Sequence, residues 1–159
     1  MATSTALSSR RGLGGFATLA GGALMIVSVF LPWFGGITGW ASVNTDLASI
    51  RSTGDFYGNY AEGFSPFFTG LSILIAGGLL VLIGLFMVAS LRGGAFHLPA
   101  VGKLIVAVLA IVIVIVGVTN LASLYATSDV DPEYGLFILT AGALIGFFGV
   151  VGGMSGRDS

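Results

Sequence analysis

The chain has 159 residues, of which 55% are apolar and 8% are charged, and its formal net charge is −1. Soluble domains carry about a quarter charged residues, so this composition excludes an ordinary soluble domain. The six basic residues are too few to form a basic face for nucleic acid, and the absence of cysteine excludes disulfides, thiol catalysis and cysteine metal sites.

Four apolar runs account for most of the chain. Each carries no charge in its middle and exceeds the roughly 18 residues needed to cross the hydrocarbon core of a bilayer. We therefore expect residues 1–159 to form one domain, an all-α membrane protein folded as a four-transmembrane-helix antiparallel bundle. The predicted spans cover about residues 13–34, 66–90, 99–121 and 133–153.

The basic residues gather on one side of these spans. Only Arg51 lies in the first or third connection, whereas the others precede the first span, flank the second connection or follow the fourth span: Arg10, Arg11, Arg92, Lys103 and Arg157. Because Lys and Arg are retained in the cytoplasm, this pattern predicts a multi-pass protein of the inner (plasma) membrane with both termini cytoplasmic. A larger first outer loop would occupy residues 35–65, an inner loop 91–98 and a second outer loop 122–132.

The segment Met1–Ser9 precedes the first span as a short polar tail, which we expect to be disordered. A cleaved export signal is an alternative, since Ser9–Leu13 loosely resembles a twin-arginine signal. The apolar run that follows is too long for a typical signal peptide and leads directly to tryptophan, which disfavours cleavage.

The first span ends in the stretch LPWFGGITGW, Leu31–Trp40. Pro32 removes a backbone donor where the helix is ending, and the glycines allow a sharp turn into the outer loop. Trp33 and Trp40 suit the outer headgroup layer, so both are predicted interfacial anchors. Beyond them, Val43–Arg51 has the spacing of a short amphipathic helix. Candidate partner contacts in this loop are the aromatic residues Trp40, Phe56, Tyr57 and Tyr60.

The second and fourth spans resemble each other. Placing Gly70 on Gly135 aligns GLSILIAGGLLVLIGLFMVAS with GLFILTAGALIGFFGVVGGMS, and 9 of 21 positions are identical. In both spans glycine recurs every seven residues and so forms one stripe, which allows the close backbone approach that packs helices in membranes. The stripes predict either an intramolecular packing seam or a docking seam for another protein. The seam residues are Gly70, Gly77, Gly84, Gly135, Gly142, Gly146, Gly149 and Gly153.

The other two spans differ from each other in their small residues. The first contains two glycine pairs, Gly14–Gly15 and Gly21–Gly22, whereas Ile105–Val118 of the third is almost entirely Val and Ile. We therefore expect the first, second and fourth spans to pack tightly and much of the third to face lipid or a partner.

Side chains that could carry chemistry are few. No ionisable residue lies deep in a span, and the mid-span hydroxyls are expected to bond to their own helices. His97 is the single histidine, and a metal site needs several ligands. Asp129, Asp131 and Glu133 could collect a divalent cation through oxygen ligands, or they could simply cap the fourth span. No catalytic, metal-binding or cofactor-binding residue is predicted, and we expect the chain not to be an enzyme.

The motif Leu31–Pro32–Trp33–Phe34, with a second tryptophan soon after it, resembles small four-pass actinobacterial integral membrane proteins that close their first helix with LPW and an aromatic residue. The resemblance covers the first span and the start of the outer loop. It implies a four-pass fold and, because some such proteins are accessory subunits of respiratory or transport complexes, a place in a larger assembly. The layout is also similar to claudin-like proteins, but their paired outer-loop cysteines are absent.

These features together predict a non-catalytic accessory or assembly subunit of a larger inner-membrane complex, with respiratory-chain assembly as the leading assignment. Its partners would be the lipid bilayer and that complex, contacted through the glycine-striped helices and the first outer loop. The alternatives are a lipid- or small-solute-handling transport component and an oligomeric channel, since one bundle of four apolar helices offers no polar pore of its own.

Overall fold

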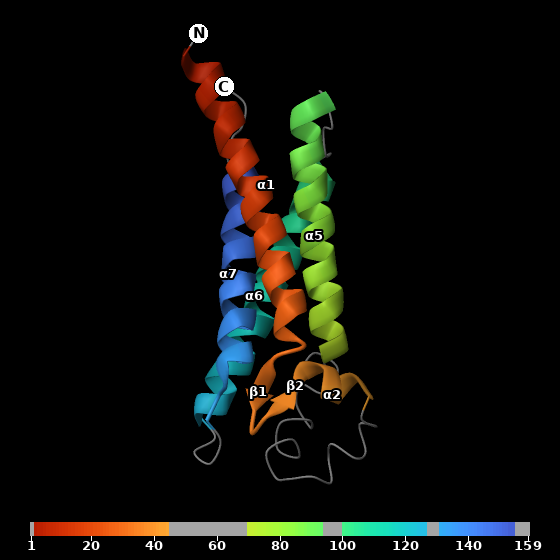
Figure 1. The fold of residues 1–159 in the computed structure, drawn as a ribbon. Helices are drawn as coiled ribbons and strands as arrows, with labels where there is room; N and C mark the ends of the chain where they lie inside the picture. The colour runs from red at the N-terminus through yellow and green to blue at the C-terminus, as the bar shows by residue number, and fades with distance from the viewer. Residues whose placement is uncertain (1, 45–69, 94–99, 127–130, 155–159) are drawn as a thin grey trace.

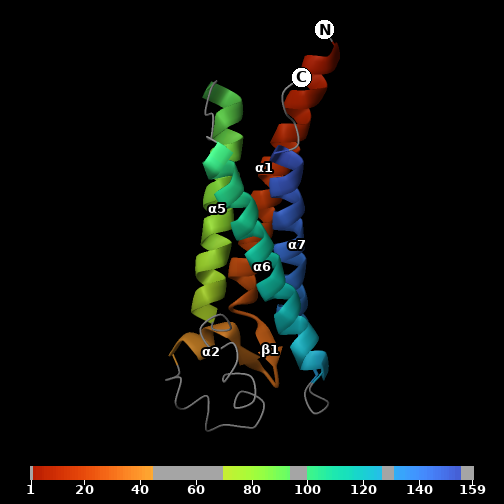
Figure 2. The ribbon, with the colours of Figure 1, turned by 180° about the vertical axis from the view of Figure 1, so that it is seen from behind.

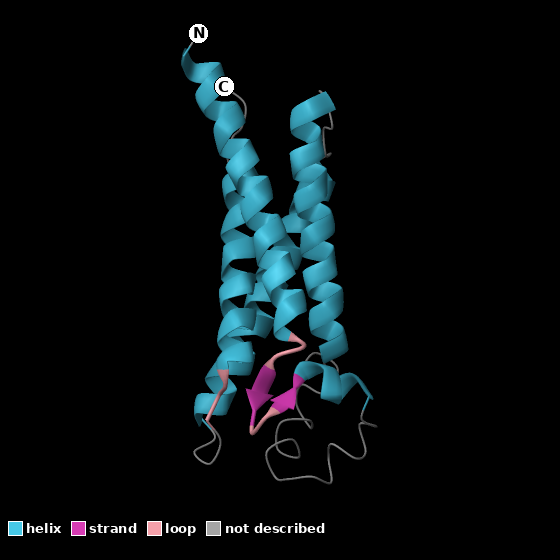
Figure 3. Ribbon diagram, in the orientation of Figure 1, coloured by secondary structure: helices cyan, strands magenta, loops and turns pink. Residues whose placement is uncertain are grey.

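The computed structural model describes residues 2–44, 70–93, 100–126 and 131–154. Within these ranges the chain is mostly helical, as the sequence predicts. Four long helices are accompanied by one short helix and a two-stranded hairpin (Figures 1 and 3). In chain order the elements are α1 (Ala2–Ser28), β1 (Pro32–Phe34), β2 (Ile37–Thr38), α2 (Gly39–Asn44), α5 (Gly70–Gly93), α6 (Ala100–Ala126) and α7 (Tyr134–Met154).

The four long helices lie side by side and alternate in direction (Figures 1 and 2). Both termini lie at one end of the molecule, and the hairpin and α2 lie at the other. Helix α1 packs against both α7 and α5, whereas α6 packs mainly against α7. Helices α5 and α6 approach each other at only a few positions, so α1 and α7 form the centre of the arrangement.

The helix boundaries differ most from the predicted spans at three places, and α5 also runs three residues past its predicted end, to Gly93. Helix α1 already begins at Ala2, so the segment expected to be a disordered tail is helical, and the helix ends at Ser28 rather than at residue 34. Helix α6 continues to Ala126, into the predicted second outer loop. Most of the predicted amphipathic helix, residues 66–69 of the predicted second span and most of the inner loop lie outside the described residues.

The early end of α1 has a physical cause in the residues that follow it. Gly35 and Gly36 both have positive φ, 53° and 76°, as the two central residues of a type I′ hairpin turn require. The turn pairs β1 with β2 in antiparallel register. Phe34 opposes Ile37 next to the turn, and Pro32 opposes Thr38 farther from it. The all-α prediction missed this hairpin because the predicted first span extended to Phe34 and so treated the residues of β1 as helix.

Two of the helices are long and apolar enough to cross a membrane, judged by length and composition: Gly70–Ser90 of α5 and Tyr134–Met154 of α7. Only 22% and 44% of their most apolar windows are buried inside the protein. The core helix of a soluble protein would be mostly buried, so these proportions favour a lipid environment. Shorter apolar segments cover Gly12–Ser28 of α1 and Leu104–Val118 of α6.

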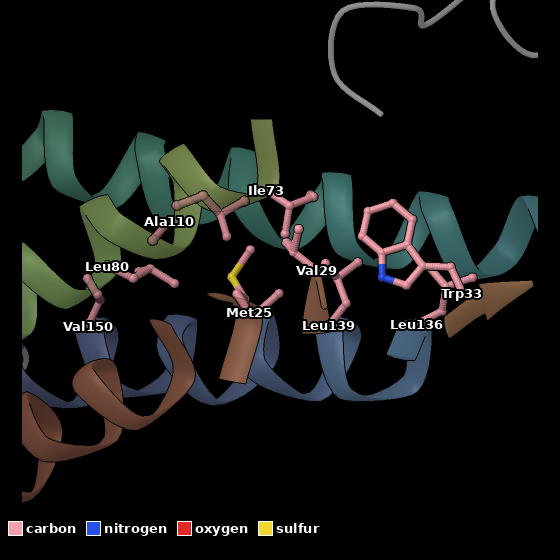
Figure 4. Close-up of a cluster of buried hydrophobic side chains, with 11 residues drawn as sticks. Met25, Val29, Trp33, Ile73, Leu80, Ala110, Leu136, Leu139 and Val150 are labelled. Atoms are coloured by element: carbon pink, nitrogen blue, oxygen red, sulfur yellow. The ribbon is translucent and has the colours of Figure 1, made fainter. Parts of the chain in front are cut away.

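The buried apolar side chains form one row along the length of the bundle, between α1 and α7 on one side and α5 and α6 on the other (Figure 4). This row extends from Val150 and Leu80 near the termini to Leu136 and Trp33 at the hairpin end. All four long helices contribute to it, so the described helices share one core. Its members are Met25, Val29, Trp33, Ile73, Leu80, Ala110, Ile113, Leu136, Leu139, Ala143 and Val150.

Candidate functional site

Helix α1 meets α7 through glycine on both sides of the contact. A Cβ added to Gly142 would lie 2.8 Å from the carbonyl oxygen of Gly21, and one added to Gly149 would lie 2.8 Å from that of Gly14. Real Cβ atoms essentially never come that close to a backbone oxygen. The two backbones can therefore pack at this distance only because both helices carry glycine here.

Helix α1 meets α5 in the same way, one residue further along its own sequence. A Cβ on Gly77 would lie 3.0 Å from the carbonyl oxygen of Gly22, and one on Gly84 would lie 3.0 Å from that of Gly15. One residue of α-helix is a rotation of about 100°. The adjacent pairs Gly14–Gly15 and Gly21–Gly22 thus give α1 two glycine faces, one for α7 and one for α5.

The structure places the other predicted seam glycines in different surroundings. Gly135 lies under β1, where a Cβ would meet the carbonyl oxygen of Pro32 at 2.5 Å. Added Cβ atoms on Gly146 and Gly153 would meet the side chains of Leu80 and Met87 in α5, while the backbones of these two glycines contact Gly21 and Gly14 of α1. Gly70 is buried as the first residue of α5.

Helix α6 sits on a second face of α7, next to the glycine face. The Thr140 hydroxyl proton is shared between the carbonyl oxygen of Gly117, at 3.1 Å, and that of Leu136 in its own helix, at 2.9 Å. A Cβ on Gly117 would lie 2.9 Å from the Cβ of Ala143. This contact thus combines one small-residue approach with one interhelical hydrogen bond.

The hairpin is fastened to the start of α7 by the main chain and by one carboxylate. The Glu133 N–H donates to the Trp33 carbonyl oxygen at 2.8 Å, and the Gly36 N–H donates to Glu133 Oε1 at 3.0 Å. The Trp40 N–H donates to the Val29 carbonyl oxygen at 2.7 Å, which ties the start of α2 to the end of α1. These bonds hold the LPWF motif against the bundle.

The two tryptophans occupy different environments, although the sequence predicts both as interfacial anchors. Trp33 is only 3% exposed, and its indole Nε1–H donates to the Ser28 carbonyl oxygen at 2.8 Å. Its ring occupies the space that a side chain at position 39 would need, so Gly39 makes room for it. Trp40 is 43% exposed and stacks on Phe30 at a centroid distance of 5.5 Å. The structure therefore corrects the placement of Trp33, which lies in the core, while the anchor role of Trp40 stays a prediction.

The remaining sequence candidates at this end fall largely outside the described residues. Phe56, Tyr57 and Tyr60, predicted as partner contacts, lie there, as does His97. Asp129 lies there too, so its convergence with Asp131 and Glu133 is a prediction that the structure leaves untested. Among residues 2–44, 70–93, 100–126 and 131–154, no three His, Cys, Asp or Glu side chains are grouped as metal ligands would be.

Buried polar side chains in the described part of the chain are three hydroxyls, and each is hydrogen-bonded. Thr18 donates to the Gly14 carbonyl oxygen at 2.8 Å and Ser28 to that of Met25 at 2.6 Å. With Thr140, all three bond to their own helix, as the sequence predicts for mid-span hydroxyls. In this part of the chain no buried side-chain nitrogen or oxygen lacks a hydrogen-bond partner.

One feature could have been read from the sequence but was missed. The Gly35–Gly36 dipeptide between short apolar segments is a hairpin signal, and it would have placed the end of α1 earlier. The burial of Trp33 has no comparable local signal, because it depends on α7 lying beneath the hairpin.

Comparison with known proteins does not assign the chain to a family. No protein-family model matches the chain, and neither a curated protein nor a solved structure is significantly similar to it.

Proposed function

We propose that this chain is a four-span protein of the inner membrane, with both termini cytoplasmic, and that it serves as a non-catalytic accessory or assembly subunit of a larger membrane complex. A respiratory-chain complex is the leading candidate for the partner, on the strength of the LPW-aromatic resemblance. The shorter apolar segments of α1 and α6 would span the membrane together with α5 and α7.

The proposed orientation is supported by where the basic residues fall on the helices. Arg10 and Arg11 lie in the first half of α1, Arg92 lies one residue before the end of α5, and Lys103 lies in the first turn of α6. These three helix ends are at the end of the molecule that carries the termini (Figure 1). Lys and Arg at one end of a bundle favour a cytoplasmic location for that end.

The observation that carries the functional proposal is the closed, apolar interior. Helix α1 is held between α5 and α7 by glycine contacts, and the buried hydroxyls of the described residues are bonded. A core packed in this way leaves no polar route for a solute between the described parts of the four helices. The surface is then where the protein acts, and large apolar side chains are exposed along α5, α6 and α7.

The test is copurification under mild detergent. A tagged chain expressed at its native level should emerge with a defined set of larger membrane proteins, identified by mass spectrometry and lost in harsh detergent. A chain that emerges alone in repeated preparations would contradict the proposed role. Lipid or solute retained between the helices, or a ring-shaped oligomer, would instead support the transport or channel alternatives.

A further inference from the structure

The repeat between the two helices that flank α1 is also a repeat in three dimensions. The alignment pairs Gly77 with Gly142, and a Cβ added to each would lie 3.0 Å and 2.8 Å from the carbonyl oxygens of Gly22 and Gly21. The aligned Gly84 and Gly149 approach Gly15 and Gly14 in the same way. Helices α5 and α7 thus dock on α1 with the same face and in the same register.

Helices α5 and α7 differ on the face next to the one that packs against α1. On α7 this face receives α6, through the Thr140 hydrogen bond and the contact between Ala143 and Gly117. The residues of this α7 face are either buried, with at most 9% exposure, or packed against the core: Leu136, Thr140, Ala143 and Phe147.

The corresponding face of α5 consists of Leu71, Ile75, Gly78 and Leu82, and we call it the α5 docking face. Its three large side chains are 51%, 56% and 51% exposed. No atom lies within 4 Å of the position where Gly78 would carry a Cβ. Among the described residues, none therefore covers on α5 the position that α6 occupies on α7.

We propose that the α5 docking face receives one apolar transmembrane helix of a partner membrane protein, lying antiparallel to α5 as α6 lies antiparallel to α7. The α6 contact in the same chain shows the kind of element that covers such a face. The α5 docking face borders the contact between α1 and α5, because one residue of helix is a rotation of about 100° from Gly77 to Gly78. This inference rests on the proposed accessory role and names the surface that would carry it.

The residues of the α5 docking face define the chemistry of the partner helix. Ile75 stands where α7 has Thr140, so the contact is apolar and needs no backbone acceptor from the partner. Gly78 stands where α7 has Ala143, so the partner can place a larger side chain there than the Gly117 that faces Ala143. An aliphatic helix with Leu, Ile or Val over Gly78 fits both conditions.

A second copy of this chain fits the position less well. In a copy of the same orientation, the helices antiparallel to α5 are α1 and α6. The glycine faces of α1 are covered by α5 and α7, but its remaining face exposes Leu13, Phe16 and Val27. Contact through the exposed surface of either helix would be head-to-tail and would grow into a ring or a filament. A distinct partner closes the site with one contact.

Two glycines with open surroundings supply a matched pair of variants. Gly78→Leu fills the α5 docking face, whereas Gly152→Leu fills an equally open position on α7, away from α6. Both should fold, with thermal unfolding in detergent close to that of the unchanged chain. We expect Gly78→Leu to reduce copurification of the partner by at least about tenfold, as overpacking of a helix contact does, and Gly152→Leu to leave it unchanged.

The identity of the occupant is tested by photo-cross-linking in the membrane, with a benzophenone maleimide attached to a single introduced cysteine, for which the cysteine-free chain is well suited. Single cysteines at Ile75 and Leu82 should cross-link to one helix of the copurifying partner, whereas a cysteine at the exposed Phe148 of α7 should not. Cross-links to a second copy, or to no protein, would overturn the inference.

The two proposals can fail separately. Retention of the partner by a folded Gly78→Leu variant would overturn the α5 docking face while leaving the accessory role intact. A chain that emerges without any partner before substitution would overturn the accessory role itself.

Discussion

Gly21 and Gly142 set the distance between α1 and α7. A Cβ on Gly142 would lie 2.8 Å from the Gly21 carbonyl oxygen, and one on Gly21 would meet the backbone of Gly146 even more closely. In a lipid environment, helices gain little from burying apolar surface against each other, so close backbone packing supplies much of their association. The stability of the bundle should therefore depend strongly on these glycines.

Substitution of one seam glycine tests this dependence. We expect Gly142→Ala to destabilise the protein by about 1–3 kcal/mol, because the new methyl group has to push the α1 backbone away. Gly152→Ala is the control, since it adds the same methyl group to the same helix where nothing lies within 4 Å. Thermal unfolding in detergent should show a lower midpoint for Gly142→Ala only, and equal midpoints would argue against the seam.

The hydroxyl of Thr140 should contribute to the attachment of α6. We expect Thr140→Val to cost about 0.6 kcal/mol and at most about 1.7, the range measured for interhelical hydrogen bonds in membranes. Ser28→Ala removes a hydroxyl that bonds only within its own helix, to the Met25 carbonyl oxygen, and should cost less. Unfolding midpoints measured side by side decide this, and a greater loss for Ser28→Ala would contradict the assignment.

The two tryptophans should differ in fluorescence. With Trp40→Phe, only the buried Trp33 emits, and we expect its emission to resist quenching by brominated lipids and by acrylamide. With Trp33→Phe, only the exposed Trp40 emits, and brominated lipids should quench it if it anchors the chain at the interface. Equal quenching of the two variants would place both rings in the same environment and contradict the structure.

The carboxylate of Glu133 should hold the tip of the hairpin. We expect Glu133→Ala to speed hydrogen exchange at the Gly36 amide, because this variant removes its acceptor. Glu133→Gln keeps an acceptor oxygen and should retain most of the protection. Asp131→Ala removes a charge from the same segment and serves as the control. If exchange at Gly36 is the same in all three variants, the Glu133 hydrogen bond does not restrain the turn.

The orientation in the membrane can be tested with single cysteines in the cysteine-free chain. Ile37→Cys lies at the exposed hairpin, and a membrane-impermeant maleimide should label it in intact cells or spheroplasts. A cysteine appended after Ser159 should react only after lysis, because the proposed orientation places both termini in the cytoplasm. Labelling of the C-terminal cysteine in intact cells, with Ile37→Cys labelled only after lysis, would show that the termini face the outside and would contradict the proposed orientation.

Much of the helical architecture is predictable because its signals are local. Apolar run length gives the four long helices, and seven-residue glycine spacing gives their small-residue faces. The boundaries of α1 were less predictable, since its apolar run continues past Ser28, where the helix is ended by Pro32 and by the turn at Gly35 and Gly36. The burial of Trp33 was not predictable from local sequence, because it depends on α7, whose sequence lies about a hundred residues away.

The sequence by itself determined that this chain is helical, highly apolar and built with repeated glycine stripes, because composition and periodicity act over a few turns of one helix. The tertiary structure decided which stripe meets which partner. It gave α1 two glycine faces one residue apart and packed α6 against α7, and no described residue covers the matching face of α5. These pairings depend on the spatial order of the helices, which no local pattern in the chain specifies.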